Sequence, residues 1–184
     1  KLSEEDIKPG FNEHLKILKD AGVDLIILEA MTSKDRTVEN IIECSKDVKL
    51  PIWLSISCAI DEDENILMHG YQESITNSKA KFYDTLENSL SKFSKMHEGP
   101  ILVAHSDITV TGEAVKILKK VHKGIVGAYP NNGYFEKPHW KLINDISPSK
   151  YLEEAKNWVS NGAQVIGGCC GVGPDKISAI SVLK

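Results

Sequence analysis

Two adjacent cysteines, Cys169 and Cys170, lie in a glycine-flanked segment that reads Gly-Gly-Cys-Cys-Gly. Neighbouring cysteines rarely form a disulfide with each other, because the small ring that closes is strained. Two adjacent thiolates can instead bind one soft metal ion, and the glycines let the backbone fold tightly around it. The alternative is a pair of small buried residues in a turn, since free cysteine often packs as a small hydrophobe.

Apolar runs rich in Ile, Val and Leu predict the strands that position these thiols. The runs span residues 23–28, 52–57, 101–104, 125–128 and 164–166. Amphipathic stretches lie between them, and residues 80–96 predict a helix with Phe82, Leu86 and Phe93 on one face. A last helix is predicted over 174–183, which begins with a proline. Apolar strands joined by helices predict an α/β fold with a parallel sheet, either doubly wound or a (β/α) barrel.

Each predicted strand is followed by side chains that can do chemistry. In chain order these are Glu29, then Ser57 and Cys58, then His105, Ser106 and Asp107, then Tyr129 and Asn131, and finally Cys169 and Cys170. Because the carboxyl ends of parallel strands meet at one edge of a sheet, we expect a single site there. Residues 59–77 form the longest stretch without a predicted element, so they are a candidate active-site loop.

Composition narrows the classes of function. The chain has 184 residues and a net charge of −4, which argues against the basic patch of a nucleic-acid-binding protein. No apolar run approaches the roughly 20 residues of a membrane helix. Four cysteines without a disulfide-like framework suit a reducing compartment, so we expect a cytoplasmic protein.

Three segments resemble the homocysteine S-methyltransferase family. The clearest is 158–171, WVSNGAQVIGGCCG, and the others are 22–29, GVDLIILE, and 127–133, GAYPNNG, with Trp140 downstream. The resemblance covers nearly all of the chain and corresponds to the C-terminal three-fifths of the family's barrel. It implies that residues 1–184 form a single domain, the last five βα units of a (β/α)8 TIM-type barrel. Upstream residues, or another chain in an oligomer, would then have to close the ring.

The resemblance also implies a reaction. In this family zinc is held by three protein thiolates, and the thiol of homocysteine is the fourth ligand. The resulting zinc-bound thiolate takes a methyl group from an activated donor, which gives methionine. Carried onto this chain, Cys169 and Cys170 become metal ligands and Glu29 meets the amino group of the substrate, with Tyr129 and Asn131 lining the same pocket. The implied partners are a small-molecule thiol and a methyl donor, with no nucleic acid and no membrane.

One position departs from the family pattern, because Ser106 stands where the third cysteine is expected. A serine hydroxyl is a poor zinc ligand, and His105 next to it could supply a nitrogen and complete a Cys2His site. Neighbours on a strand point in opposite directions, so this role needs a bend at the strand end. His105 could equally be an ordinary polar residue packed near the site.

Two other functions therefore stay open. A barrel relative with a degraded metal site would act as a small-molecule binding protein, and metal content separates it from the methyltransferase. A vicinal-dithiol redox or metal-sensing protein would have no need for the carboxylate of Glu29.

Overall fold

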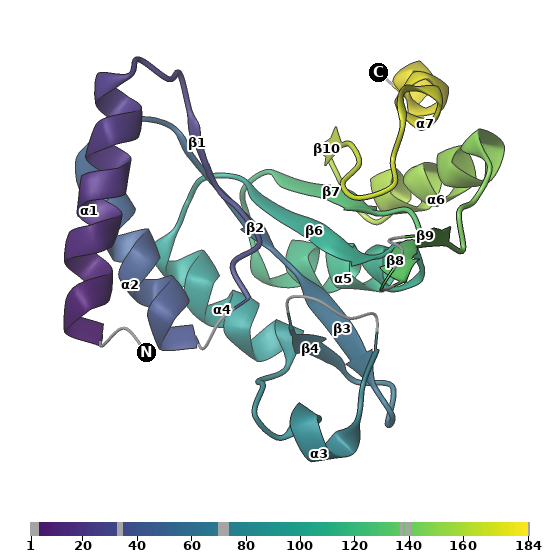
Figure 1. The fold of residues 1–184 in the computed structure, drawn as a ribbon, viewed down its shortest axis with the longest axis horizontal. Helices are drawn as coiled ribbons and strands as arrows, with labels where there is room; N and C mark the ends of the chain where they lie inside the picture. The colour runs from purple at the N-terminus through teal and green to yellow at the C-terminus, as the bar shows by residue number, and fades with distance from the viewer. Residues whose placement is uncertain (1–3, 33–34, 70–73, 137, 139–140, 184) are drawn as a thin grey trace.

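The computed structural model describes residues 4–32, 35–69, 74–136, 138 and 141–183. Within these residues its main sheet has five parallel strands in the order β1-β2-β6-β7-β10 (Figure 1). They are β1 (Ile26–Leu28), β2 (Ile52–Ile56), β6 (Ile101–Asp107), β7 (Val126–Asn131) and β10 (Val165–Ile166). Each falls on a predicted apolar run, so the parallel α/β fold is confirmed.

The longer helices form a row in which each one contacts the next member of the row. They are α1 (Glu4–Asp20), α2 (Asp35–Ser45), α4 (Leu86–Met96), α5 (Ile108–Val121), α6 (Pro148–Ser160) and α7 (Pro174–Ile180). Short 3-10 turns follow α2 at Lys46–Val48 and α7 at Ser181–Leu183. This succession, visible from α1 to α6 in Figure 1, is the outer ring of a (β/α) barrel rather than the two layers of a doubly wound sheet.

The segment 59–77, expected to be an irregular loop, contains short strands among its described residues, and residues 70–73 of it lie outside the described part of the chain. It contains a small sheet in the order β4-β3-β5, built from β3 (Cys58–Asp61), β4 (Ile66–Met68) and β5 (Ser74–Ile75). Helix α3 (Asn77–Ala80) follows it. The expectation of irregular structure was wrong because pairing between β3 and its neighbours satisfies backbone groups that the sequence alone left without partners, while the role as an active-site loop stays a prediction.

The helix predicted over 80–96 starts later than its apolar spacing suggested. Helix α4 begins at Leu86, and the Thr85 hydroxyl caps it by accepting a hydrogen bond from the Asn88 amide at 3.3 Å. Phe82 lies before this cap and is 70% exposed, whereas Leu86 and Phe93 are buried. The capping side chain therefore decided where the helix begins.

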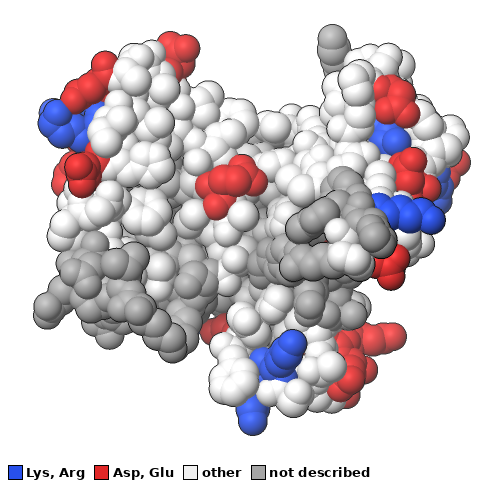
Figure 2. Space-filling model, viewed as in Figure 1, with Lys and Arg blue, Asp and Glu red and all other residues white. Residues whose placement is uncertain are grey.

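The core lies between the sheet and this row of helices, with Leu54, Ile101 and Val126 fully buried on neighbouring strands. A second hairpin, β8 (Tyr134–Glu136) with β9 (Lys141–Ile143), follows β7, and Trp140 falls outside the described residues. On the face in Figure 2, acidic and basic side chains are scattered and mixed instead of forming one basic surface. Among the described residues, the structure contains no helix long and apolar enough to cross a membrane.

Candidate metal centre

Cys169, Cys170 and His105 come together at the carboxyl end of the sheet. The Sγ atom of Cys169 lies 3.9 Å from that of Cys170, and the Nδ1 atom of His105 lies 3.8 Å and 3.7 Å from the two sulfurs. All three residues are partly buried. Two sulfurs and one imidazole nitrogen at this spacing are a donor set that can hold a metal ion.

The turn that carries the two thiols is tied to the end of β7. The Cys169 amide donates to the Pro130 carbonyl at 2.9 Å, and the Asn132 amide donates to the Cys170 carbonyl at 2.8 Å. Gly171 has a φ of +75°, and a Cβ there would lie 2.2 Å from the Asn132 carbonyl oxygen. Only glycine fits this close approach, so backbone contacts with β7 fix where the thiols point.

A fully buried asparagine, Asn132, joins this turn to the segment at Asp145 and Ile146. Its side-chain amide donates to the Asp145 carboxylate and, at 3.1 Å, to the Gly171 carbonyl. Its side-chain oxygen accepts from the Ile146 amide at 3.1 Å, and buried Lys176 lies 3.1 Å from the same Asp145 carboxylate. Sequence reasoning missed Asn132, because nothing in the sequence distinguishes it from its neighbour.

His105 reaches the thiols through an irregular end of β6. The register between β6 and β7 shifts between Ala104 and Asp107, and His105 has a φ of +47°. A left-handed backbone at a residue other than glycine costs roughly 1–2 kcal/mol and marks a local constraint. This is the bend that the sequence required. Ser106 is buried, and its hydroxyl contacts the Cys58 thiol. Asp107 caps α5 by accepting a hydrogen bond from the Thr109 amide at 2.7 Å.

The carboxylate of Glu29 forms a second polar group beside the thiols. Tyr129 donates its hydroxyl to one carboxylate oxygen at 2.8 Å, and the Ser55 hydroxyl lies 3.4 Å from the other. Ser55 was missed by sequence reasoning, although a serine inside the apolar run of β2 is a usable signal. Asn131, predicted to line the pocket, accepts a hydrogen bond from the Cys170 amide at 3.3 Å and so also holds the turn.

The environment favours neutral forms of the thiol and the phenol when no cation is bound. Burial, followed by the neighbouring Cys170 thiol, raises the pKa of Cys169. The pKa of Tyr129 is raised by burial and, more weakly, by its hydrogen bond to Glu29 and that residue's charge. Tyr129 therefore stays a hydrogen-bond donor, and a cation is required to hold Cys169 as a thiolate at neutral pH.

The other cysteines lie outside this cluster. Cys58 is 1% exposed, and burial raises its pKa to about 12, so it is an inert buried thiol. Cys44 is buried in the core beside α1, where its Sγ atom lies 3.9 Å from the Lys8 carbonyl oxygen.

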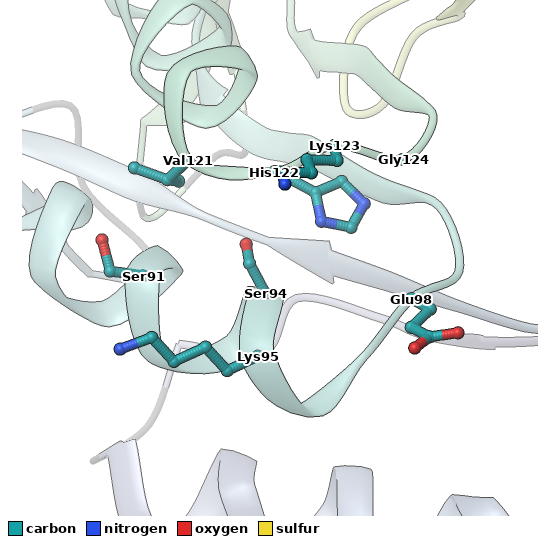
Figure 3. Close-up of a pocket in the computed structure, with 8 residues that line it drawn as sticks. All are labelled: Ser91, Ser94, Lys95, Glu98, Val121, His122, Lys123 and Gly124. Atoms are coloured by element: carbon teal, nitrogen blue, oxygen red, sulfur yellow. The ribbon is translucent and has the colours of Figure 1, made fainter.

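A groove of about 710 Å³ lies at the opposite, amino end of the strands. Figure 3 shows Ser91 and Ser94 of α4 pointing toward Val121 and His122 of the following unit. His122 is 3% exposed as a residue, and its Nε2 atom lies 3.1 Å from the Gly99 carbonyl oxygen. None of the strand-end residues predicted from the sequence lines this groove.

The combination of a parallel barrel-like sheet and a strand-end dithiol can be compared with known proteins. Homocysteine S-methyltransferase 3 of Zea mays is 27% identical over 190 residues, and selenocysteine methyltransferase of Astragalus bisulcatus is 23% identical over 189 residues. Each match covers 97% of this chain, with 49% and 50% of the respective relatives. The chain thus spans about half the length of the curated relatives it matches.

The solved structures agree on the fold. The metallated form of the homocysteine methyltransferase MmuM from Escherichia coli superposes with a TM-score of 0.67 at 18% identity, covering 96% of this chain and 52% of that one. Its oxidized form gives a TM-score of 0.65 at the same identity and coverage. The model of the family described as "Homocysteine S-methyltransferase" matches residues 1–183. With the dithiol turn and the barrel strands inside that match, the chain belongs to the homocysteine S-methyltransferase family.

Proposed function

We propose that this chain supplies the metal-binding and homocysteine-binding part of an enzyme that methylates the thiol of homocysteine to give methionine. The observation that carries the proposal is the convergence of three ligand atoms, from Cys169, Cys170 and His105, at the carboxyl end of a barrel sheet. Membership of the family supports the substrate class. The proposal includes that residues 1–184 act as one domain, the C-terminal three-fifths of the barrel.

The donor set fits zinc. Bond lengths of about 2.3 Å to sulfur and 2.0–2.1 Å to nitrogen, at tetrahedral angles, place ligand atoms about 3.5–3.8 Å apart. The separations between Cys169, Cys170 and His105 are 3.7 to 3.9 Å. With three protein ligands, one tetrahedral position stays open for a substrate thiol. When bound, zinc would lower the pKa of that thiol so that it is a thiolate at neutral pH.

The other polar residues orient the substrate. The Glu29 carboxylate is exposed and held in place by Tyr129 and Ser55, so it can receive the ammonium group of an amino acid as a charge-assisted partner. Asn131 and the backbone of β7 hold the dithiol turn in place through hydrogen bonds. Fixed ligands on one side and a fixed carboxylate on the other would align the substrate thiol for attack on the methyl donor.

The two alternatives predict different site chemistry. A barrel with a degraded metal site would lack a third ligand atom near the two thiols, and the His105 nitrogen, 3.8 Å and 3.7 Å from the sulfurs, supports the metal-binding alternative instead. A dithiol redox or metal sensor would not require the hydrogen-bonded carboxylate of Glu29 beside the thiols.

Zinc analysis of the full-length protein, prepared under reducing conditions with zinc supplied, tests the metal centre. We expect about one zinc per chain, consistent with a single Cys2His site. Cys170→Ser removes one sulfur ligand and should abolish stoichiometric zinc. Cys44→Ser changes a buried core cysteine and is the matched control, which should retain the metal. Absence of zinc from the unsubstituted protein would rule the centre out.

Methionine formation tests the reaction separately. The full-length protein is given homocysteine with S-methylmethionine, S-adenosylmethionine, betaine or a methyl-folate in turn. One donor should yield methionine, and Glu29→Gln should raise KM for homocysteine about tenfold or more with a smaller effect on kcat. A protein that binds zinc but forms no methionine with any of these donors would contradict methyl transfer while leaving the metal centre standing.

A further inference from the structure

The backbone at His105 is held in an unfavourable conformation that its own sequence does not explain. His105 has a φ of +47°, although it is not a glycine and has no glycine beside it in the sequence. Side chains disfavour this left-handed region, so such a residue persists only where its surroundings hold it. The restraint must come from the residues on either side or from the adjacent strand.

Ser106 provides such a restraint within its own strand. Its hydroxyl donates a hydrogen bond to the Ala104 carbonyl at 2.9 Å. This bond spans His105, joining the residue before it to the residue after it. A side chain that bonds two residues back along the chain closes a small loop and competes with the regular ladder. The register shift of β6 against β7 lies in this same stretch.

The same hydroxyl is also fixed from the neighbouring strand. It accepts a hydrogen bond from the Cys58 amide at 2.9 Å, and the Cys58 thiol lies 3.5 Å from it. Ser106 is 2% exposed and Cys58 is 1% exposed, so water does not compete for these groups. Since Cys58 begins β3 directly after β2, the hydroxyl ties the end of β6 to a second part of the sheet.

We propose that Ser106 is the positioning residue of the candidate metal centre and acts through His105 rather than as a ligand. Its hydroxyl locks the end of β6 in the bend that directs the imidazole to Cys169 and Cys170. The serine at the position where the family pattern suggested a cysteine is then an anchor and not a lost ligand. The expected effect of Ser106 on zinc binding rests on the proposed metal-binding function. The bend at His105, in contrast, is a property of the metal-free chain.

A pair of buried serines allows a matched test in the full chain. Ser106→Ala removes the anchor, whereas Ser57→Ala removes a fully buried hydroxyl that has no hydrogen-bond partner among the described residues. We expect Ser106→Ala to weaken zinc binding about 10- to 100-fold, the range for partners that orient a ligand, and Ser57→Ala to leave it unchanged. Equal affinities for the two variants would overturn the proposal.

X-ray absorption at the zinc edge gives a readout that general destabilisation would not move. Sulfur and nitrogen ligands differ by about 0.2–0.3 Å in their bond lengths to zinc. The Ser106→Ala protein should keep its two sulfur ligands and lose the imidazole nitrogen, whereas the Ser57→Ala protein should keep all three. An unchanged nitrogen ligand in Ser106→Ala would contradict the role of Ser106.

Crystal structures of the metal-free variants separate this proposal from the proposed function. If the unsubstituted protein binds no zinc, the metal centre fails, but the backbone of His105 still tests the anchor. In Ser106→Ala we expect His105 to leave the left-handed region and its ring to leave the two thiols. A ring that keeps its place would overturn the proposal whatever the zinc content.

A second variant covers the case in which Ser106→Ala does not fold, as judged by circular dichroism. Ser106→Cys is nearly isosteric and replaces the hydroxyl by a weak acceptor. Its sulfur would face Cys58 and not the dithiol, so bound zinc should still show two sulfur ligands with a weakened or missing nitrogen. A third sulfur ligand in this variant would show that position 106 faces the metal and would overturn the proposal.

Discussion

Histidines stand at both ends of the sheet, and their partners differ completely. At the carboxyl end, the His105 Nδ1 atom lies within 3.8 Å of two thiol sulfurs, those of Cys169 and Cys170. At the amino end, His97 and His122 place their Nε2 atoms 3.3 Å from the Pro100 carbonyl oxygen and 3.1 Å from that of Gly99. The first arrangement gathers ligands, whereas the second satisfies backbone groups at the starts of strands.

The contrast shows what identifies a site in this fold. The amino end holds a groove of about 710 Å³, yet its histidine is already bonded to the backbone. The carboxyl end is marked by converging donor atoms and a backbone residue with positive φ. Convergence of possible ligand atoms is therefore a better guide to chemistry here than the volume of a groove.

The largest expected contrast is in metal affinity. His105→Ala should weaken zinc binding by more than about 100-fold, or about 2.8 kcal/mol, because a ligand is lost. His122→Ala, the matched change at the other end, should leave zinc affinity unchanged. Competition with a zinc-binding dye measures both. If the two variants lose affinity equally, the distinction between the two ends is wrong.

The next effect concerns the support of the dithiol turn. Asn132→Ala should lower the free energy of unfolding by about 2 kcal/mol, because it leaves the Gly171 carbonyl and Ile146 amide without their buried partner. Asn88→Ala, which removes an exposed asparagine bonded to Asp84, is the control and should cost less than about 1 kcal/mol. Urea unfolding measures the free energy of unfolding of both variants. Equal losses would show that the buried hydrogen bonds of Asn132 contribute no more stability than the exposed one of Asn88.

A smaller effect is a pH dependence that belongs to the amino end. Burial lowers the pKa of His97 and that of His122. The charge of His122 lowers the pKa of His97 further, and the charge of Lys119 does the same for His122. Because the folded pKa lies below the unfolded value, the unfolded state binds more protons in acid. Stability is thus fully present above about pH 6.5 and is lost as the pH falls, by at most about 1.4 kcal/mol per pH unit per histidine.

Urea titrations between about pH 5 and 7.5 measure this loss. Exchanging both histidines for glutamine keeps a side-chain donor but removes the titration, so the slope should become shallower. An equally steep slope in the double variant would assign the pH dependence to other groups.

The smallest effect is expected inside the groove. The Ser94 hydroxyl is buried and has no hydrogen-bond partner among the described residues. Ser94→Ala should change stability by no more than about 0.5 kcal/mol, because no bond is broken, and should leave zinc affinity unchanged. Thermal unfolding with zinc titration measures both. A clear loss of zinc affinity in Ser94→Ala would show that the groove is coupled to the metal centre. It would then contradict the contrast between the two ends of the sheet.

Much of the fold could be predicted because its signals are local. The apolar runs gave all five parallel strands, and the proline at 174 began the last helix where expected. The start of α4 was misplaced, because the apolar spacing of Phe82 outweighed the cap at Thr85. The small sheet after β2 escaped prediction, since its strands are short and are defined only by their pairing.

The residues of the candidate site likewise fall into those that local sequence signals predict and those that only tertiary contacts place. The sequence by itself determined the dithiol turn and the polar strand ends, because glycine, cysteine and strand periodicity act over a few residues. Tertiary structure alone decided which of His105 and Ser106 faces the thiols. That choice depends on a hydrogen bond between Ser106 and the Cys58 amide, 48 residues away, and on a register shift against β7. Strand alternation carries no information about such long-range contacts, and these contacts bend the strand against its own periodicity.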